Sequence, residues 1–241
     1  MPGVKVSPMC SHFEAIRQWE NYVKYFHVTP PDPPQGKLDM WPRYQGVFIR
    51  RPPETDPHDE AVPIAEALSG RWGLVPWRLK PDPVEIKKAM TRSTFNARVE
   101  GIEKNFTFGP AWQRGQRCIV PADAFYEPDW RTGKAVATRF TRADGQPVGI
   151  AGLWDVWTEP GKQPLLSFTM LTMNATDHGL LKNYHRPEDE KRIVVILPES
   201  RYDDWLKAPA NQSMDFIRHY PADQLIATAI PPKAEAQKEL L

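Results

Sequence analysis

The sequence lacks long apolar runs. No stretch of about 18 consecutive apolar residues occurs in the chain, so we expect no membrane-spanning helix. No apolar segment stands near the first residues either, so we expect no secretory signal peptide. Both absences favour a cytoplasmic protein that has no association with a membrane.

Cysteine and glycine are also scarce. Cys10 and Cys118 are the only cysteines, too few for a disulfide framework or for a zinc site of their own. We therefore expect no metal site, no cofactor and a reducing compartment. The 14 glycines are outnumbered by 26 prolines, which predicts many stiff turns and few long helices.

An excess of charge of one sign is missing as well. The 31 Lys and Arg side chains nearly balance the 30 Asp and Glu side chains, and the net charge is +1. This balance excludes a strongly basic protein that wraps nucleic acid over its whole surface. A local basic groove remains compatible with it, because the distribution of charge matters more than the sum.

Short strands separated by turns dominate the pattern of the chain. Apolar residues at three- and four-residue spacing predict a helix over residues 11–26, opened by a capping-box pattern at Ser11 and Glu14. Further helices are expected over residues 109–116, 177–184 and 202–206. Strands are expected over residues 46–50, 70–77, 117–121, 125–127, 135–141, 148–156, 165–173 and 192–197, and a surface loop over 51–63. This order predicts a single α+β domain, with an antiparallel-dominated mixed sheet or barrel-like core flanked by helices.

Cys10 is the first residue that could carry chemistry. A free cysteine is often only a small buried hydrophobic residue. If the preceding residues are absent, however, Cys10 carries a free α-amine, whose pKa is about 7.7–8.0 against about 10.4 for lysine. An amine and a thiol two carbons apart can capture an aldehyde as a five-membered thiazolidine, which an internal cysteine cannot do.

Asn96 and Arg98 lie two residues apart, which places them on one face if the segment is extended. An amide donor beside a guanidinium suits recognition of a sugar phosphate. A turn or cap role for Asn96, and a surface ion pair of Arg98 with Glu100 or Glu103, are the structural alternatives.

Glu127 and His185 are candidates for proton transfer. Glu127 follows the apolar run Ala124-Phe125-Tyr126, where desolvation can raise the proton affinity of a carboxylate. His185 is the kind of side chain that exchanges protons near neutral pH. A solvent-facing strand end for Glu127 and a surface or core position for His185 are the alternatives.

Four motifs follow one another along the chain. They are Met9-Cys10, then Phe95-Asn96-Ala97-Arg98-Val99-Glu100, then the block RCIVPADAFYE from Arg117 to Glu127, and then Tyr184-His185-Arg186-Pro187. In this order they resemble the SOS response-associated peptidase (SRAP) family, from Met9 to about residue 235. The resemblance divides the chain into a leader over 1–9, an SRAP-like domain over 10–235 and a tail over 236–241.

The resemblance implies a DNA repair protein that binds single-stranded DNA bearing an abasic site and crosslinks to it covalently. It implies that Cys10 is the nucleophile, that Asn96 orients it, that Glu127 handles protons, and that His185 assists sugar opening or crosslink reversal. It also implies an autoproteolytic peptidase that removes the residues before the cysteine, with lyase-like activity on the DNA. No obligate protein partner is evident, and we expect a monomer.

The DNA contacts are expected from basic and aromatic side chains that interleave in the sequence, because such mixtures combine backbone contacts with base stacking. The candidates are Arg71, Trp72, Trp77, Arg98 and His12. Further members of the same run are Arg78, Arg92, Arg114, Arg117 and Trp112. A wet surface over an aromatic core is the alternative interpretation of this mixture.

The sequence departs from the family pattern at several positions. His12 stands where the family start Met-Cys-Gly-Arg-Phe has arginine, and the segment that usually reads Asn-x-Ala-Pro is Asp39-Met40-Trp41-Pro42. Pro128 replaces the usual tryptophan after the glutamate, and an acidic insert over 188–190 follows the histidine motif. His12 is expected to replace the lost phosphate contact only in part.

Two other functions fit the same residues. One is a cysteine-dependent peptidase that uses Cys10 with His185 and Glu127 on peptides in trans. The other is a DNA-binding module without catalysis. Either a translation start at Met9 or self-cleavage of the Met9–Cys10 bond would free the Cys10 amine. Cys118, in a buried-strand pattern, is expected to be a core thiol that does not bond to Cys10.

Overall fold

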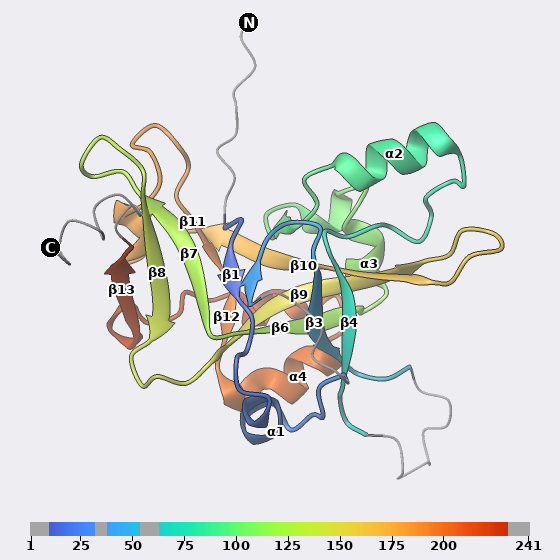
Figure 1. The fold of residues 1–241 in the computed structure, drawn as a ribbon, viewed down its shortest axis with the longest axis horizontal. Helices are drawn as coiled ribbons and strands as arrows, with labels where there is room; N and C mark the ends of the chain where they lie inside the picture. Colours follow the sequence, from blue (N-terminus) through green and yellow to red (C-terminus); the bar gives the residue numbers. More distant parts are fainter. Residues whose placement is uncertain (1–9, 32–37, 54–62, 231–241) are drawn as a thin grey trace, which may run out of the picture.

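The computed structural model describes residues 10–31, 38–53 and 63–230. It contains two β-sheets that share one interior, with short helices around them (Figure 1). Ten of the twelve strand pairings are antiparallel, and β10 makes the two parallel ones. The predicted α+β class with an antiparallel-dominated sheet is confirmed.

Five strands of the larger sheet close into a ring. Their order is β10–β4–β3–β6–β9, and β9 pairs again with β10. Gly152 of β9 lies opposite both Cys118 of β6 and Met170 of β10, at the place where the ring closes. The strands are β3 (Gln45–Arg50), β4 (Glu66–Trp72), β6 (Arg117–Ala122), β9 (Val148–Trp157) and β10 (Leu165–Asn174), extended by β5 (Asn96–Arg98), β11 (Arg192–Val194) and β12 (Ile196–Leu197).

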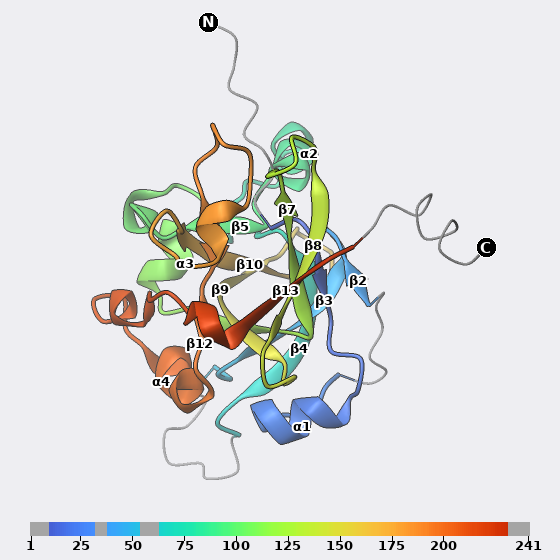
Figure 2. The same cartoon turned by 90° about the vertical axis from the view of Figure 1, so that its left-hand side faces the viewer.

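The smaller sheet packs its apolar face toward this ring. Its strands, in hydrogen-bonded order, are β13 (Leu225–Ala229), β8 (Val136–Arg142), β7 (Ala124–Asp129), β1 (Phe13–Glu14) and β2 (Asp39–Met40). Phe13, Phe125 and Phe140 face one another across three strands and are buried. Because side chains alternate along a strand, their neighbours Tyr126 and Arg139 lie on the opposite face. Figure 2 shows β7, β8 and β13 in front of the strands of the ring.

Four α-helices lie around the sheets in the part of the chain that the structure describes. They are α1 (Glu20–Phe26), α2 (Pro83–Thr91), α3 (Gly109–Gln113) and α4 (Tyr202–Lys207). The start of α2 is capped by the Asp82 carboxylate, which accepts hydrogen bonds from the backbone N–H groups of Val84 and Glu85. In Figure 1, α2 and α3 lie beside one end of β9 and β10, and α1 and α4 lie below the ring.

Cys118 is completely buried in β6, and Trp205 of α4 donates its indole N–H to the Cys118 carbonyl oxygen at 2.8 Å. Both cysteines are free. The predictions that Cys118 is buried and that it does not bond to Cys10 are therefore confirmed. No helix within the described residues is long and apolar enough to cross a membrane.

Several predicted elements need correction. Residues 11–26 are not one helix, since β1 occupies Phe13–Glu14 and α1 begins only at Glu20. The predicted helix over 177–184 is only a 3-10 turn at Leu181–Asn183, and the strand over 192–197 is divided into β11 and β12. α2 and β13 were not predicted. The predictions for residues 1–9, 54–62 and 236–241 lie outside the described residues.

Candidate active site

Cys10 lies just before β1 and is 1% exposed. Its thiol donates a hydrogen bond to the His12 carbonyl oxygen at 3.7 Å, beside the pairing of β1 with β7. Burial raises the pKa of the Cys10 thiol well above its ordinary value, and the nearby Glu127 carboxylate raises it further. Backbone hydrogen bonds at Tyr126 and His12 oppose this shift only in part. The thiol is therefore protonated at neutral pH.

Asn96 reaches Cys10 from the other sheet. It begins β5, which pairs in parallel with β10, and its side chain is buried. The Asn96 side-chain amide donates a hydrogen bond to the Cys10 carbonyl oxygen at 2.9 Å. A side chain of the larger sheet thereby holds the backbone of the candidate nucleophile against the smaller sheet.

Glu127 and His185 form a buried pair. Glu127 lies on the inner face of β7, and its carboxylate is 2.7 Å from Nε2 of His185. The backbone N–H of Arg192 donates to Nδ1 of the same ring at 3.5 Å, which leaves the proton of a neutral imidazole on Nε2. His185 has a left-handed backbone, with φ of 65°, and its N–H donates to the Pro128 carbonyl oxygen at 2.9 Å. The backbone thus directs this ring toward Glu127.

These contacts join the four motif residues into one site at the junction of the two sheets. Asn96 contacts Cys10, the Glu127 carboxylate acts on the Cys10 thiol, and His185 contacts Glu127. The structure brings Cys10, Asn96, Glu127 and His185 together, while the expected pocket lined by all four and their chemical roles remain predictions.

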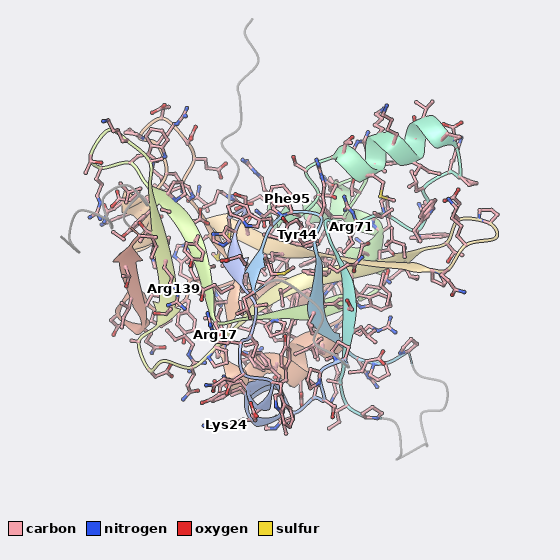
Figure 3. All side chains as sticks on the ribbon, in the orientation of Figure 1. Arg17, Lys24, Tyr44, Arg71, Phe95 and Arg139 are labelled. Carbon is pink, nitrogen blue, oxygen red and sulfur yellow. The ribbon has the colours of Figure 1, made fainter. Side chains whose placement is uncertain are left out.

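Two of the predicted DNA-binding residues are buried. Trp72 is fully enclosed, packs edge-on against Phe13 and Phe95, and donates its indole N–H to the Phe95 carbonyl oxygen. Arg71 donates to the carbonyl oxygens of Gly73 and Met90. Figure 3 shows Arg71 and Phe95 at the same end of the sheets. Neither Trp72 nor Arg71 presents a surface to a ligand in this structure.

Arg117 and Trp112 are buried in the same way. The Arg117 guanidinium stacks between Trp112 and Trp205 and donates to Ser213 and to the Trp112 carbonyl oxygen. Burial lowers the pKa of Arg117 to about 10. This part of the basic and aromatic run therefore belongs to the core, which agrees with the alternative interpretation of an aromatic core.

Trp77 is half-exposed beside a large cavity. Arg78 and Arg114 lie over its ring at 5.0 and 5.2 Å from the centroid. The cavity has a volume of about 670 Å³ and lies between the segment over 74–80, α2 and α3. The four site residues do not line it, so it is separate from the Cys10 site.

Arg98 is half-exposed at the end of β5, and its partner is an acidic residue of the insert. Its Nη1 is 2.7 Å from Glu190, whereas Glu100 binds Arg192 instead. Arg192 also donates to Glu190 at 2.8 Å. Burial acts to raise the pKa of Glu190, but the hydrogen bond from Arg192 and the charges of Arg192 and Arg98 hold it below its ordinary value. The expected ion pair of Arg98 with Glu100 or Glu103 is replaced by one with Glu190.

His12 is held between two aromatic rings. Trp41 stacks on one face, with the ring centroids 4.3 Å apart, and Tyr126 stacks on the other at 4.0 Å. Nε2 of His12 is 3.0 Å from Asp39. Trp41, Tyr126 and Glu190 are contact residues that were not predicted from the sequence as site residues. Trp41 and Glu190 were visible only as departures from the family pattern, without an indication of what they contact.

Comparison with known proteins shows a family match. The family model described as SOS response associated peptidase (SRAP) matches residues 9–235. The chain is 29% identical over 178 residues to the abasic site processing protein YoaM of Bacillus subtilis, which covers 70% of each chain. It is 29% identical over 206 residues to the abasic site processing protein YedK of Escherichia coli, which covers 83% of this chain and 80% of YedK.

Solved structures show the same fold. A crystal structure of a Bordetella bronchiseptica protein superimposes with a TM-score of 0.83 at 48% identity, and covers 92% of this chain and 100% of that protein. A protein from Bacteroides thetaiotaomicron superimposes with a TM-score of 0.73 at 16% identity, over 94% of each chain. At that identity the second likeness concerns the fold alone.

Proposed function

This chain belongs to the SOS response-associated peptidase family, and from that premise we propose that it captures abasic sites in single-stranded DNA through Cys10. The observation that carries the proposal is the joining of Cys10, Asn96, Glu127 and His185 in one buried site. Relatives named as abasic site processing proteins support the target. The adduct would be a thiazolidine, formed once Cys10 has a free α-amine.

The order of bond formation follows from the state of the thiol. Because the raised pKa keeps the Cys10 thiol protonated, the α-amine is the better first nucleophile. The amine attacks the aldehyde carbon of the ring-opened sugar and forms a carbinolamine. Loss of water gives an iminium ion. Addition of the sulfur to the same carbon, with loss of the thiol proton, closes the thiazolidine, and its ring nitrogen keeps the iminium N–H. Aldehyde, amine and thiol thus become one ring and one water.

Glu127 and His185 would move the protons of this sequence. The Glu127 carboxylate, whose charge acts on the Cys10 thiol, would accept a proton from the attacking amine and return it to the departing hydroxyl group. His185, on the far side of Glu127, would supply a proton to Glu127 through Nε2, and Glu127 would pass it to the ring oxygen as the closed sugar opens. Asn96 is a positioning residue, because it holds the Cys10 carbonyl and not the reacting atoms.

The contacts of the thiol favour this reaction over a cysteine peptidase acting in trans. Such a peptidase needs a thiolate paired with an imidazole. Here the Cys10 thiol donates to a carbonyl oxygen, and Nε2 of His185 faces Glu127. The high pKa of the thiol also opposes formation of a thiolate. Self-removal of the leader would instead use Glu127 and His185 on the Met9–Cys10 bond.

A crosslinking experiment tests the proposal. Protein translated from Met9, with Met9 removed, is incubated with a single strand that carries one abasic site, and the products are separated on a denaturing gel. We expect a heat-stable shifted band from this protein and none from Cys10→Ser. Because Cys10→Ser keeps the α-amine, it should still form an imine that borohydride traps. Cys118→Ala serves as the matched control and should crosslink like the unaltered protein.

The full chain provides the second arm of the experiment. While Met9 is still attached, the Cys10 nitrogen is an amide and cannot attack an aldehyde. We therefore expect crosslinking only in the fraction that has lost the leader, as measured by intact mass. Equal crosslinking with the leader retained, or a heat-stable band from Cys10→Ser without reductant, would overturn the proposal.

A further inference from the structure

A row of stacked rings crosses the outer face of the smaller sheet. β1 pairs with β2 on one side and with β7 on the other, and the register places His12 beside Trp41 and Tyr126. The rings of Trp41 and Tyr126 are inclined by only 6° and 13° to that of His12. The row continues to Arg139 of β8, which pairs with Tyr126 (Figure 3). Strands β7 and β8, together with the residues next to the ends of β1 and β2, thus contribute to one continuous platform.

Polar contacts hold this row in place. Asp39 binds Nε2 of His12 at 3.0 Å. Glu14 accepts hydrogen bonds from the Tyr126 hydroxyl and, at 2.9 and 2.7 Å, from the Arg139 guanidinium. The rings are therefore ordered before any ligand binds, and a further ring can join the stack at a small entropic cost.

Trp41 is the terminal ring of the row and is 44% exposed. His12 covers one of its faces, so the exposed area belongs to the other face and the edges. Trp41 also opens the turn in which the Tyr44 N–H donates to the Trp41 carbonyl oxygen, and this turn leads from the smaller sheet to the ring of strands. The open face thus stands where the chain passes from one sheet to the other.

His12 does not present a ring face to a phosphate. Both faces of the His12 imidazole are covered, and its Nε2 faces the Asp39 carboxylate. Position 12 has arginine in the family pattern and position 41 has alanine. In this chain His12 and Trp41, the residues at these two positions, stack on each other. We infer that a stacking contact here replaces the charged contact of the family arginine.

We propose that the exposed face of Trp41 stacks on an unpaired base of the bound strand, next to the abasic nucleotide held at Cys10. The inference rests on the proposed function and adds a binding site for a nucleobase to it. The two sites are close along the chain, because the His12 carbonyl oxygen accepts the hydrogen bond of the Cys10 thiol. An abasic nucleotide has no base to stack, so a neighbouring base supplies the missing contact.

The test measures the affinity for a labelled single strand that carries a tetrahydrofuran abasic analogue, which binds without crosslinking. Trp41→Ala should weaken binding roughly 5- to 150-fold, the range for loss of one base–aromatic stack. Trp41→Phe should retain most of the affinity. The slope of log K against log salt should not change, because no phosphate contact is lost. Trp19→Ala, at a tryptophan that is 54% exposed on the start of α1, is the matched control and should bind normally.

Strands that lack one further base, on the 5′ or the 3′ side of the analogue, complete a double-mutant cycle. We expect one of these strands to bind the unaltered protein as weakly as Trp41→Ala binds the full strand. Trp41→Ala should lose no further affinity for that strand. If Trp41→Ala lowers the affinity for all strands equally, or for none of them, the stacking proposal is overturned. The crosslinking test of the proposed function does not depend on this result. If the unaltered protein binds none of the strands, both proposals fail.

Discussion

The Glu190 carboxylate pairs with the guanidinium of Arg98, which the sequence analysis named as a candidate DNA contact. Glu190 lies 2.7 Å from Arg98 and is held on its other side by Arg192. A phosphate that binds Arg98 must therefore displace an anion that the protein itself supplies. The acidic insert thus lowers the gain from this contact, because the ion pair must be broken first.

We expect Glu190→Gln to bind single-stranded DNA more tightly than the unaltered protein, by up to about 5-fold at low salt, which corresponds to ~1 kcal/mol for a half-exposed ion pair. The salt dependence should become steeper because Arg98 is then free to contact phosphate. Fluorescence anisotropy over a range of salt concentrations measures both effects. Glu188→Gln removes the same charge two residues away and should change little. Similar gains from both variants would show that only net charge matters.

The ionisation of Cys10 gives a second prediction at the scale of a residue. Burial is the main cause of the raised pKa of its thiol, and the Glu127 carboxylate is the next. In a Cys118→Ala background we expect no thiolate at Cys10 as the pH rises through the ordinary thiol pKa of about 8.5. Glu127→Gln should move the titration to lower pH, but only in part, because the burial remains.

Ultraviolet absorbance of the thiolate, followed against pH, measures this titration. His12→Ala serves as a comparison because the Cys10 thiol contacts the backbone of that residue and not its side chain. Identical curves with and without the Glu127 carboxylate, or a thiolate already present at neutral pH, would contradict the prediction and the amine-first order of the reaction.

Individual site residues could be predicted from the sequence where they belong to one of the four family motifs. Cys10, Asn96, Glu127 and His185 could be named from short patterns, and the structure joins them. Trp41 and Glu190 could be recognised only as unusual residues, because their partners lie 29 or more residues away along the chain or on another strand. The burial of Trp72 and Arg71 was not predicted either, because an Arg-Trp pair occurs both in protein cores and in nucleic-acid-binding grooves, and the sequence alone does not distinguish the two.

Among the elements, the segment after Cys10 shows how pairing can outweigh local preference. Ser11 and Glu14 form a capping-box pattern, yet Phe13 is a strand residue opposite Phe125 and Met40. The free energy of burying Phe13 between two strands exceeds the weak preference of the segment for helix. The same register positions His12 and the backbone of Cys10. A helix at this place would remove the site.

The closure of the ring at Gly152 gives a prediction for the stability of the sheet. A Cβ atom on Gly152 would lie 2.5 Å from the Thr169 carbonyl oxygen and 2.8 Å from the Cys118 sulfur. The carbonyl belongs to β10 and cannot move without opening the ring. We expect Gly152→Ala to lower the free energy of unfolding by about 1–3 kcal/mol, in the range for overpacked cores. Urea denaturation measures the change as a shift of the midpoint at constant slope.

Gly46→Ala is the matched comparison on β3. Its Cβ would meet the terminal methyl group of Met40 at 2.6 Å, and this flexible end can turn aside. We therefore expect a clearly smaller loss of stability. An equal loss of unfolding free energy in the two variants would mean that a side chain at the ring closure is no more destabilising than one on β3.

On the scale of the whole molecule, the strands were predicted well and their partners were not. Alternating apolar residues identified most of the strands and the α+β class. The ring, however, depends on β10 pairing in parallel with β4 and β5 and antiparallel with β9 and β11. Such pairings join segments that are remote in sequence, and a pattern with a period of two residues carries no information on which remote strand is the neighbour.

The burial of Cys10 has a consequence for the timing of synthesis. A separate aminopeptidase that removes Met9 needs an extended and accessible end, and the folded site leaves Cys10 only 1% exposed. His185 leaves the ribosome roughly 10–35 s after Cys10 at about 5–20 residues per second. If an external enzyme removes Met9, we expect it to act on the nascent chain, during that interval. Self-removal through Glu127 and His185, as proposed above, would start only after the interval has ended. The two proposed routes to a free amine would thus be separated in time by the folding of the protein.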